Sequence, residues 1–377
     1  MELVVDPAEV AEKDRRLREF MTSRGLAGLL LSGAHRFAWA TGGRDNRVAR
    51  AAAPATGVGH ALYTPDAKYL LCDNVEEPRL RDEERLEEQG FTFVTAPWYA
   101  FDLAAEARKR VPGGGAGTLG ADTPLPGATL VADRELAPLR YSLTPAEIGR
   151  YRWLGRVTAA AMESTAYAIE PGMREVEVGA VLEHFLGDEG VTSAVTLVAS
   201  DARIARYRHP LPTARPVEHT VMYVTGATRF GLHASATRLV CFGRAPVELA
   251  RRHDAVCAVD TIFNTHTRPG ARVADIFAAA RAAYALQGFA DEWTLHHQGG
   301  ATGYSGRDYK ATPDIDETVR PRQAFAWNPS ITGTKSEDTL LAADAGPEIL
   351  TAASRNWPTR RVETPRGALD RPLILER

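Results

Sequence analysis

The first part of the chain alternates between helical and strand-like hydrophobic patterns. Residues 7–24 place apolar side chains at helical spacing, and Gly25 ends this predicted helix. A charged segment at 76–90 predicts another helix. Short apolar runs predict strands at 25–32, 60–64, 68–73 and 91–96. This alternation predicts a small α/β domain.

A sharper change of pattern falls near residue 142. The segment TPAE at 144–147 matches a helix capping box, in which Thr144 and Glu147 satisfy each other's backbone amides and Pro145 opens the helix. We expect a long helix from there to about Ile169. The change of pattern divides the chain into two predicted domains, 1–141 and 142–377.

The second predicted domain repeats a unit of helix, Pro-Gly pair, helix and strand. The Pro-Gly pairs stand at 171–172 and 269–270, and the helices after them end at Gly190 and Gly288, at equal distances from their pairs. Strand-like residues follow both copies, as SAVTLVAS and EWTLHHQGG. Matched spacing and matched flanks predict an internal duplication.

Composition and charge exclude several classes of function. The chain has 377 residues, of which 44% are hydrophobic and 25% charged, and a net charge of −3, which does not suit a general nucleic-acid binder. Its three cysteines are far apart and form no CxxC, so neither a disulfide scaffold nor a thiolate metal site is expected. The N-terminus lacks the apolar region of a signal peptide, and the longest apolar stretch, 25–31, is too short to span a bilayer. We expect a cytoplasmic protein without nucleic-acid or membrane partners.

Several motifs carry a resemblance through their order and spacing. They are GLAGLLLSGAHRFAWATGG, LTPAEIGRYR, the two Pro-Gly–helix units, FGLHASATR, HHQGGATGY, NPSITG and KSEDTLL. Together they resemble the pita-bread superfamily, which includes methionine aminopeptidase, Xaa-Pro aminopeptidase, prolidase and creatinase. The resemblance covers nearly the whole chain. It implies an α/β (α+β) protein with a small N-terminal creatinase-like domain followed by a duplicated pita-bread domain.

The resemblance also places the metal ligands of the peptidases. Those enzymes hold two divalent ions with two Asp, one His and two Glu, and the matching positions here are Val224, Ser235, His297, Asn328 and Glu337. Val224 offers no ligand atom, and one carboxylate cannot offset the charge of two dications. The chain thus resembles a member that lacks most metal ligands, and we expect neither a metal nor another cofactor. One zinc ion held by His297, Glu337 and a third histidine is the alternative.

Creatinase resembles these peptidases but hydrolyses a C–N bond without metal. Its catalytic His falls on His209 and one of its acids on Glu337, whereas its other catalytic Glu falls on Thr237. A histidine near its ordinary pKa works as a general acid or base, and a partly buried Glu needs a His or a cation beside it. If 296–297 lie on a strand, one ring faces the cavity, and the resemblance selects His297. The predicted catalytic residues are His209, Glu337 and His297.

Other polar residues are predicted to bind substrate. Alternate positions on one strand put His233, Ser235 and Thr237 on the same cavity wall and turn Arg238 away as a structural residue. A buried Asn328 needs a hydrogen bond from backbone or substrate. The full predicted set is His233, Ser235, Thr237, Asn328, Lys335, Tyr304, Arg44 and Arg47.

The arginines of this set follow the turn at 41–43. In creatinase-like dimers the matching loop resembles a lid over the site of the other subunit, which implies carboxylate binding by Arg44, Arg47 and Arg50. A solvated arginine loop is the alternative. The resemblance therefore implies a homodimer.

These residues favour a metal-independent, creatinase-like enzyme. It would hydrolyse, or eliminate at, a C–N bond of a small polar substrate that is amino-acid-like or an amide or amidine. One alternative is an inactive pita-bread protein that binds a peptide or protein, as histone chaperones of this fold do. The retained His209, His297 and Glu337 argue against that alternative. The other alternative is a Xaa-Pro aminopeptidase-like metallopeptidase, which the ligand losses oppose.

Overall fold

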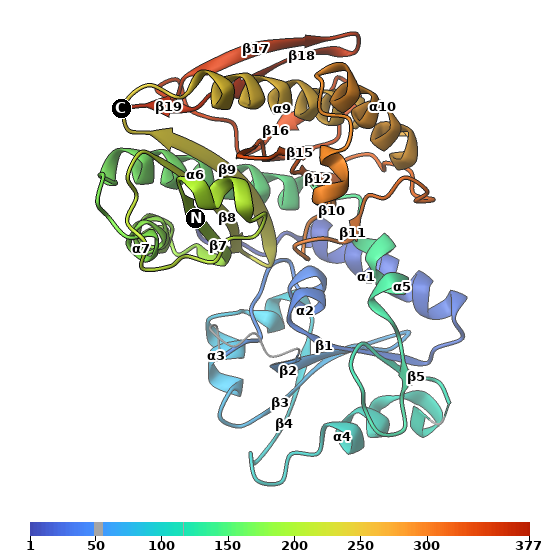
Figure 1. Ribbon diagram of the computed structural model, residues 1–377. Coiled ribbons are helices and arrows are strands. Elements are labelled where there is room, and N and C mark those ends of the chain that lie inside the picture. The colour runs from blue at the N-terminus through green and yellow to red at the C-terminus, as the bar shows by residue number, and fades with distance from the viewer. Residues whose placement is uncertain (49–55, 116) are drawn as a thin grey trace. The chain divides into compact units, whose positions relative to one another are not determined.

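Figure 1 shows the computed structural model of the protein, which describes residues 1–48, 56–115 and 117–377. The chain forms two compact units. One comprises Met1–Arg140 with Thr144–Glu147, and the other comprises Tyr141–Leu143 with Ile148–Arg377. The division into domains 1–141 and 142–377 stays a proposal.

The first unit is built on a six-stranded sheet in the order β4-β3-β2-β1-β5-β6. Its strands are β1 (Gly28–Gly33), β2 (Thr56–Tyr63), β3 (Lys68–Asp73), β4 (Thr92–Ala96), β5 (Leu119–Ala121) and β6 (Thr129–Leu130). Its helices are α1 (Pro7–Ser23), α2 (Ala34–Ala40), α3 (Glu77–Asp82), α4 (Leu103–Arg110) and α5 (Asp133–Leu136), with short 3₁₀ turns η1 (Leu86–Gln89), η2 (Pro112–Gly115) and η3 (Ala137–Arg140). The predicted α/β alternation is confirmed.

One predicted element of this unit is wrong. The charged segment 76–90 does not form a single helix, because α3 ends at Asp82 and η1 begins at Leu86. Arg85 between them has a φ of 51°, a left-handed conformation that no right-handed helix can contain. Charge and helical composition alone did not reveal this break.

The second unit holds a duplicated set of helices and strands. Its helices are α6 (Pro145–Ala168), α7 (Glu175–Gly187), α8 (Ala202–Arg206), α9 (Val247–His266) and α10 (Val273–Leu286), with the 3₁₀ turn η4 (Glu292–Leu295). Its strands are β7 (Thr192–Ser200), β8 (Thr220–Arg229), β9 (Leu232–Cys241), β10 (Gly299–Thr302), β11 (Tyr309–Lys310), β12 (Ala324–Trp327), β13 (Ser330–Ile331), β14 (Thr334–Lys335), β15 (Asp338–Leu341), β16 (Glu348–Ile349), β17 (Thr359–Thr364), β18 (Gly367–Pro372) and β19 (Leu375–Glu376). The main sheets have the orders β19-β9-β8-β7 and β11-β10-β12-β15-β16.

The two Pro-Gly turns have the same hydrogen bonds, which confirms the duplication. Gly172 donates its N–H to Val217 O at 2.8 Å, and Gly270 donates to Val319 O at 2.9 Å. Both glycines have positive φ, 89° and 84°, a conformation that glycine adopts without steric cost. The capping box before α6 also forms, since Thr144 N–H donates to Glu147 Oε2 at 2.7 Å.

Helices cover the sheets, and their apolar faces form the core. In Figure 1, α9 and α10 lie against the sheet that contains β12 and β15, with the β17–β18 hairpin on α9. Phe263 of α9 stacks on Trp327 of β12 with ring centroids 4.5 Å apart. In the described part of the chain, no helix combines the length and apolar character needed to cross a membrane.

The two main sheets of the second unit join along β9 and β15. Thr237 N–H donates to Glu337 O at 3.2 Å, and the Thr339 hydroxyl both accepts from Ser235 N–H at 2.7 Å and donates to Ser235 O at 3.0 Å. These bonds fix the backbone at the start of β15. The joint therefore brings the predicted site residues Ser235 and Thr237 close to Glu337.

Candidate active site

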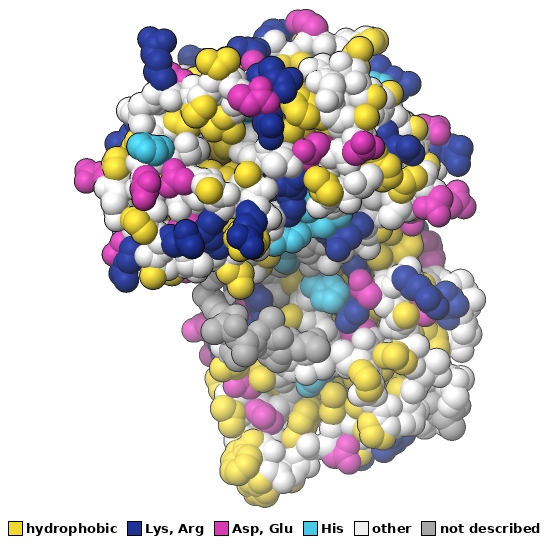
Figure 2. Space-filling view, viewed as in Figure 1, with side chains coloured by type: hydrophobic (Ala, Val, Ile, Leu, Met, Phe, Trp, Pro, Cys, Tyr) yellow, Lys and Arg dark blue, Asp and Glu magenta, His cyan; other side chains and the backbone are white. Residues whose placement is uncertain are grey.

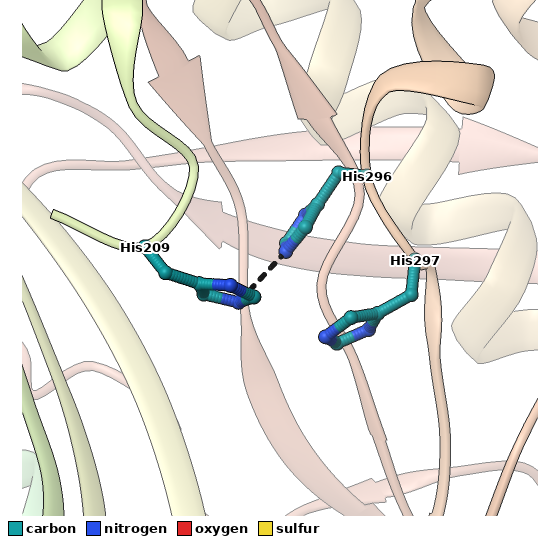
Figure 3. A group of neighbouring side chains, drawn as sticks. All are labelled: His209, His296 and His297. Carbon is teal, nitrogen blue, oxygen red and sulfur yellow. Dashed lines mark hydrogen bonds between the residues drawn. The ribbon is translucent and has the colours of Figure 1, made fainter.

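Three histidines converge beside this joint. His209 lies in the segment after α8, and His296 and His297 lie between η4 and β10 (Figure 3). The Nε2 atoms of His209 and His296 are 3.1 Å apart, and the ring centroids of His296 and His297 are 4.5 Å apart. His209 is exposed, His297 is half-buried and His296 is buried. The convergence brings two of the predicted catalytic residues together.

The structure corrects the prediction that His296 and His297 alternate on a strand. The segment EWTLHHQGG is a 3₁₀ turn followed by irregular backbone, and β10 begins only at Gly299. Gly299 has a φ of 92°, and a Cβ there would approach Ala326 O to 2.1 Å, so only glycine fits. Because the pair lies outside the strand, both rings face His209, and His296 joins the candidate site. The Gly-Gly pair was the signal in the sequence that the strand begins late.

Hydrogen bonds indicate where the imidazole protons lie. Gly299 N–H donates to Nδ1 of His297 at 3.3 Å, so a neutral His297 carries its proton on Nε2. The 3.1 Å contact between the Nε2 atoms of His209 and His296 requires a proton on one of the two nitrogens. Each of these two contacts therefore involves one imidazole nitrogen of the cluster in a hydrogen bond.

All three imidazoles have lowered pKa values. Burial and the positive charge of Lys335 lower the pKa of His296 to about 2. Burial, Arg307 and Lys310 lower the pKa of His297 to about 4. Burial and Lys335 also lower the pKa of His209, while Glu337 acts in the opposite direction. The histidines are thus neutral near pH 7, as a general base must be.

Glu337 is held by cations rather than by histidine. Its Oε2 is 2.7 Å from Lys335 Nζ and accepts a hydrogen bond from the Thr237 hydroxyl at 2.6 Å, and its Oε1 is 3.5 Å from Arg307 Nη2. Although burial raises the pKa of Glu337, the charges of Lys335 and Arg307 and these hydrogen bonds hold it below its usual value. Glu337 therefore stays ionised and positions Lys335. Arg307 was not predicted, because nothing in SGRD marks it in the sequence.

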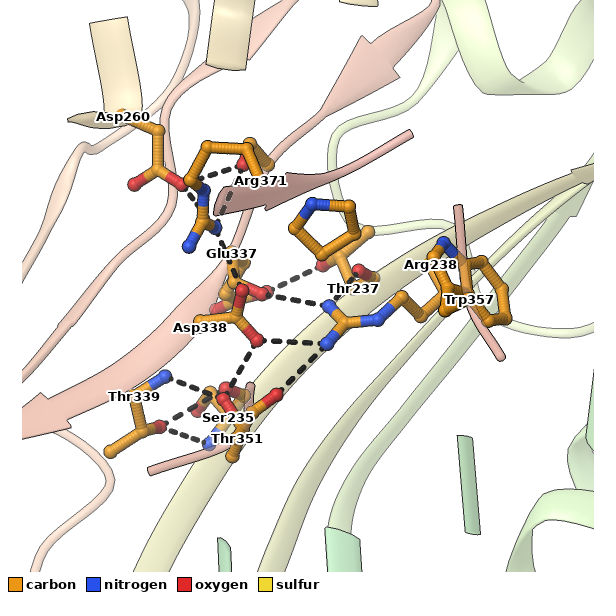
Figure 4. Close-up of polar contacts among 12 residues, drawn as sticks. Ser235, Thr237, Arg238, Asp260, Glu337, Asp338, Thr339, Thr351, Trp357 and Arg371 are labelled. Carbon is orange, nitrogen blue, oxygen red and sulfur yellow. Dashed lines mark hydrogen bonds and ion pairs between the residues drawn. The ribbon is translucent and has the colours of Figure 1, made fainter. Parts of the chain in front are cut away.

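A buried ion-pair network fixes β15 behind Glu337 (Figure 4). Asp338 pairs with Arg238 at 3.0 Å and with Arg371 at 2.7 Å. Arg371 also pairs with Asp260 at 2.5 Å, and Asp338 accepts from the Thr351 hydroxyl at 2.8 Å. Two cations balance two carboxylates, so the network is neutral as a whole. These contacts agree with the structural role that strand parity predicted for Arg238.

The predicted substrate-binding residues of the second compact unit differ from one another in their contacts. Thr237 contacts Glu337 directly, and Ser235 lies two residues before it on β9. Asn328 is 2% exposed, and its carboxamide oxygen has no hydrogen-bond partner among the described residues. Tyr304 is buried, with its hydroxyl 3.4 Å from Arg150 Nη2, and the backbone oxygen of His233 accepts from Tyr151. A role of Tyr304 and His233 in substrate binding stays a prediction.

The predicted loop arginines belong to the other compact unit. Arg44 is buried, and Arg47 forms two bonds of 2.9 Å to the carboxylate of Asp45. Arg50 lies outside the described residues. A role of Arg44 and Arg47 in the site of a second subunit stays a prediction.

The surface of the molecule carries both signs of charge. Figure 2 shows Lys and Arg side chains interspersed with Asp and Glu, and histidine side chains that reach the surface with basic side chains beside them. The overall charge of −3 is thus no guide to the local charge at one place on this face.

The chain has a smaller α/β unit followed by a duplicated α/β unit, with polar residues where the two sheets of the second unit join. This fold is that of the pita-bread class of proteins. Within this class the chain belongs to metallopeptidase family M24, whose family model matches residues 150–344. No curated protein matches the chain. The expected superfamily and fold class are confirmed.

Solved structures show the same fold over nearly the whole chain. A Xaa-Pro dipeptidase from Bacillus anthracis is 22% identical, with a TM-score of 0.76, and the match covers 92% of this chain and 99% of that one. A prolidase from Pyrococcus horikoshii OT3 is 19% identical, with a TM-score of 0.73 and the same coverage of 92% and 99%. The N-terminal domain of the FACT complex subunit SPT16 from Cicer arietinum is 10% identical, with a TM-score of 0.69 and coverage of 92% and 97%. At these identities the likeness shows the fold alone.

The name metallopeptidase implies metal ions. Whether such ions fit this chain depends on the donor atoms at the positions that match the metal ligands. Val224 presents only an apolar side chain, and the carboxylate of Glu337 is engaged by Lys335 at 2.7 Å. Ser235 and Asn328 add only neutral oxygens, which cannot offset two dications. The residues at these positions do not fit a two-metal centre.

A single ion among the histidines meets a different obstacle. Their nitrogens lie within 4.8 Å of one another, close enough to approach one ion. Binding, however, would have to displace the proton that the present hydrogen bonds put on His297 Nε2 and the one between His209 and His296. Lys335 and Arg307 would also repel a dication. The positive charges around the cluster thus oppose a bound dication.

We expect no tight binding of a divalent ion. Calorimetric titration of the dialysed protein with Zn²⁺ or Mn²⁺ should show no stoichiometric binding, and the melting temperature should not change. Stoichiometric Zn²⁺ binding that disappears in His209→Ala or His297→Ala would contradict the proton-holding arrangement.

We expect Arg371→Met to destabilise the fold strongly. The substitution leaves Asp260 and Asp338 buried without this cation, and removal of one partner of a buried pair costs about 3–5 kcal/mol. Urea unfolding measures the loss. Arg361→Met on the same hairpin is the control, because Arg361 is 62% exposed and surface changes usually stay within about 0.5 kcal/mol. Equal stabilities of the two variants would refute the role of the network.

Proposed function

We propose that this chain is a hydrolase of family M24 that cleaves a C–N bond of a small polar substrate by proton transfer at the three-histidine cluster, without metal. The observation that carries the proposal is the 3.1 Å contact between the Nε2 atoms of His209 and His296. Membership of a peptidase family supports hydrolysis at a C–N bond. The neutral state of the imidazoles supports their use as bases.

The histidine pair has two proton arrangements that suit the two halves of hydrolysis. When His209 donates its Nε2 proton to His296, the Nδ1 lone pair of His209 is free to accept a proton from water. When His296 donates instead, Nδ1 of His209 carries a proton that it can give to a leaving nitrogen. His209 is exposed, so it is the member that meets substrate and solvent.

The proposed reaction balances as an ordinary hydrolysis. Water loses a proton to His209 while its oxygen bonds to the carbon of the C–N bond. The C–N bond then breaks, and the same proton goes to the leaving nitrogen. The products are an acid and an amine, and the protein is unchanged. A lyase reaction would use the same groups but needs no water.

The comparisons support the Xaa-Pro peptidase-like alternative better than the creatinase-like reading. The family and the enzymes named above are peptidases, and none is a creatinase. A peptide bond is also a C–N bond, so the proposal includes a short peptide as substrate. What separates it from the alternative is the source of the base, which is His209 here rather than metal-bound water.

Three further parts of the proposal concern location, assembly and substrate size. We propose a cytoplasmic protein, a homodimer as in the resemblance to creatinase, and a small-molecule substrate. Membrane attachment by a helix finds no support in the described residues. The Asp45–Arg47 pair gives the predicted lid no direct support, since it occupies the guanidinium that would bind a substrate carboxylate.

We expect His209→Ala to lower kcat by about 10²–10⁴-fold, because a general acid–base group contributes that much. The assay is release of amine from a set of amides and dipeptides, with circular dichroism to check folding. His184→Ala is the control, since His184 is an exposed histidine on α7. If His209→Ala hydrolyses a substrate of the parent protein at the parent rate, the proposed base is wrong.

We expect the acid limb of kcat/KM to lie below pH 6.5, because His209 must be neutral and its pKa is lowered from 6.5. Two variants should move this limb in opposite directions. Lys335→Met removes a charge that lowers the pKa of His209 and should shift the limb upward. Glu337→Gln removes a charge that raises it and should shift the limb downward. Shifts in the same direction would show that His209 does not govern the limb.

A further inference from the structure

The side chains at this site carry a positive charge, whereas a metallopeptidase site needs negatively charged ligands to hold its metal cations. Lys335 and Arg307 both approach Glu337, and one carboxylate cannot neutralise two cations. Lys310 adds a further positive charge that acts on His209 and His297. With two cations on one carboxylate, the side chains at Glu337 sum to a positive charge. A buried positive charge needs a counter-ion.

Lys335 has hydrogen-bonding capacity that the protein does not use. Its side chain is 4% exposed, and Glu337 at 2.7 Å is its acceptor. An ammonium group has three N–H donors, and among the described residues Glu337 is the one partner of the Lys335 Nζ atom. Leaving donors of a buried cation unsatisfied is costly. A ligand acceptor beside Glu337 would remove this cost.

Arg307 is unsatisfied in a similar way. Its Nη1 donates to Gly306 O at 2.6 Å, but its contact to Glu337 is 3.5 Å, at the limit of hydrogen bonding. Its Nε is buried and has no partner among the described residues. The side chain is 16% exposed, so a ligand can reach it. Guanidinium groups favour planar or tetrahedral oxyanions as partners.

A buried hydrogen-bond acceptor, Asn328, lies beside the segment that carries the histidine pair. The carboxamide oxygen of Asn328 is buried and has no hydrogen-bond donor among the described residues. The backbone N–H of Asn328 donates to the carbonyl oxygen of Gln298 at 3.1 Å, and Gln298 directly follows His297 in the chain. An N–H group on a ligand would satisfy it. The unused groups are thus donors at Lys335 and Arg307 and an acceptor at Asn328.

We infer that this site binds a small molecule carrying an oxyanion, a carboxylate or a phosphate, through Lys335 and Arg307, with an N–H group of the same molecule directed to Asn328. The inference rests on the proposed function and narrows its substrate class to anionic amides. It places a substrate anion where the resemblance places metal cations. Glu337 is then a positioning residue that holds both basic side chains.

The test is binding of small probes to the full-length protein at constant ionic strength. Malonate and inorganic phosphate carry the oxyanion, and malonamide is the neutral analogue of malonate. Calorimetry should detect malonate or phosphate but not malonamide, and the histidine ring NMR signals should shift on binding. The stronger of the two anions identifies the chemical group. Equal binding of malonate and malonamide would overturn the inference.

Variants show whether the two cations bind the probe. Arg307→Met keeps the Lys335–Glu337 pair, so it should fold, and it should weaken anion binding roughly 10- to 100-fold, as expected for loss of a charge-assisted hydrogen bond. Lys335→Met should do the same, and the double variant Lys335→Met/Glu337→Gln removes the buried pair together if the single variant does not fold. Lys109→Met, at a side chain 65% exposed in the other unit, is the control. Parent-like binding by Arg307→Met would refute the site.

The outcome is separable from that of the proposed function. Hydrolysis of neutral amides without inhibition by malonate would overturn the oxyanion inference and leave the hydrolase. Anion binding at this site in a protein that hydrolyses no amide would support the inference and overturn the proposed hydrolysis.

Discussion

The buried contact between Lys335 and Glu337 determines the chemistry of the second unit. At 2.7 Å, with both side chains less than 5% exposed, it commits the carboxylate of Glu337 to an ammonium group. That commitment removes the acid from metal binding and from proton donation. It also leaves the charge of Arg307 largely uncompensated. Burial and Lys335 lower the pKa of His209 while Glu337 acts in the opposite direction, and the engaged carboxylate is one reason why the site does not fit metal.

Most of the fold could be predicted from sequence because its signals are local. Hydrophobic periodicity located the long helices. The Pro-Gly pairs indicated the duplication, because both turns need a positive φ after the proline and glycine adopts it at no steric cost. The site was predicted only in part. His209, His297 and Glu337 came from the resemblance, but the proximity of His296 depends on where β10 begins, which the backbone at Gly299 decides. Arg307 lies in a loop whose path depends on tertiary contacts, so no sequence pattern could place its guanidinium.

The contacts also bear on whether the chain is a binder or an enzyme. Its fold is shared by peptidases and by a FACT subunit domain, so the fold cannot decide. A binding surface gains nothing from three neutral imidazoles in contact, one of them buried at a desolvation cost. Proton transfer requires such groups with their lone pairs available. The neutral network of Asp260, Asp338, Arg238 and Arg371 adds rigidity behind the site, which positioned chemistry needs more than adaptable binding does.

The cationic surroundings and the histidine base support each other once an anion is bound. In the free protein, burial together with Lys335 and Arg307 lowers the pKa of His209 and His297, which makes these neutral imidazoles weak bases. An oxyanion that pairs with these cations cancels part of their field, which raises the pKa of the nearby imidazoles. His209 then accepts a proton more readily when substrate is present than when it is absent. By linkage, protonation of His209 also strengthens anion binding, so substrate capture and the proton-transfer step stabilise each other.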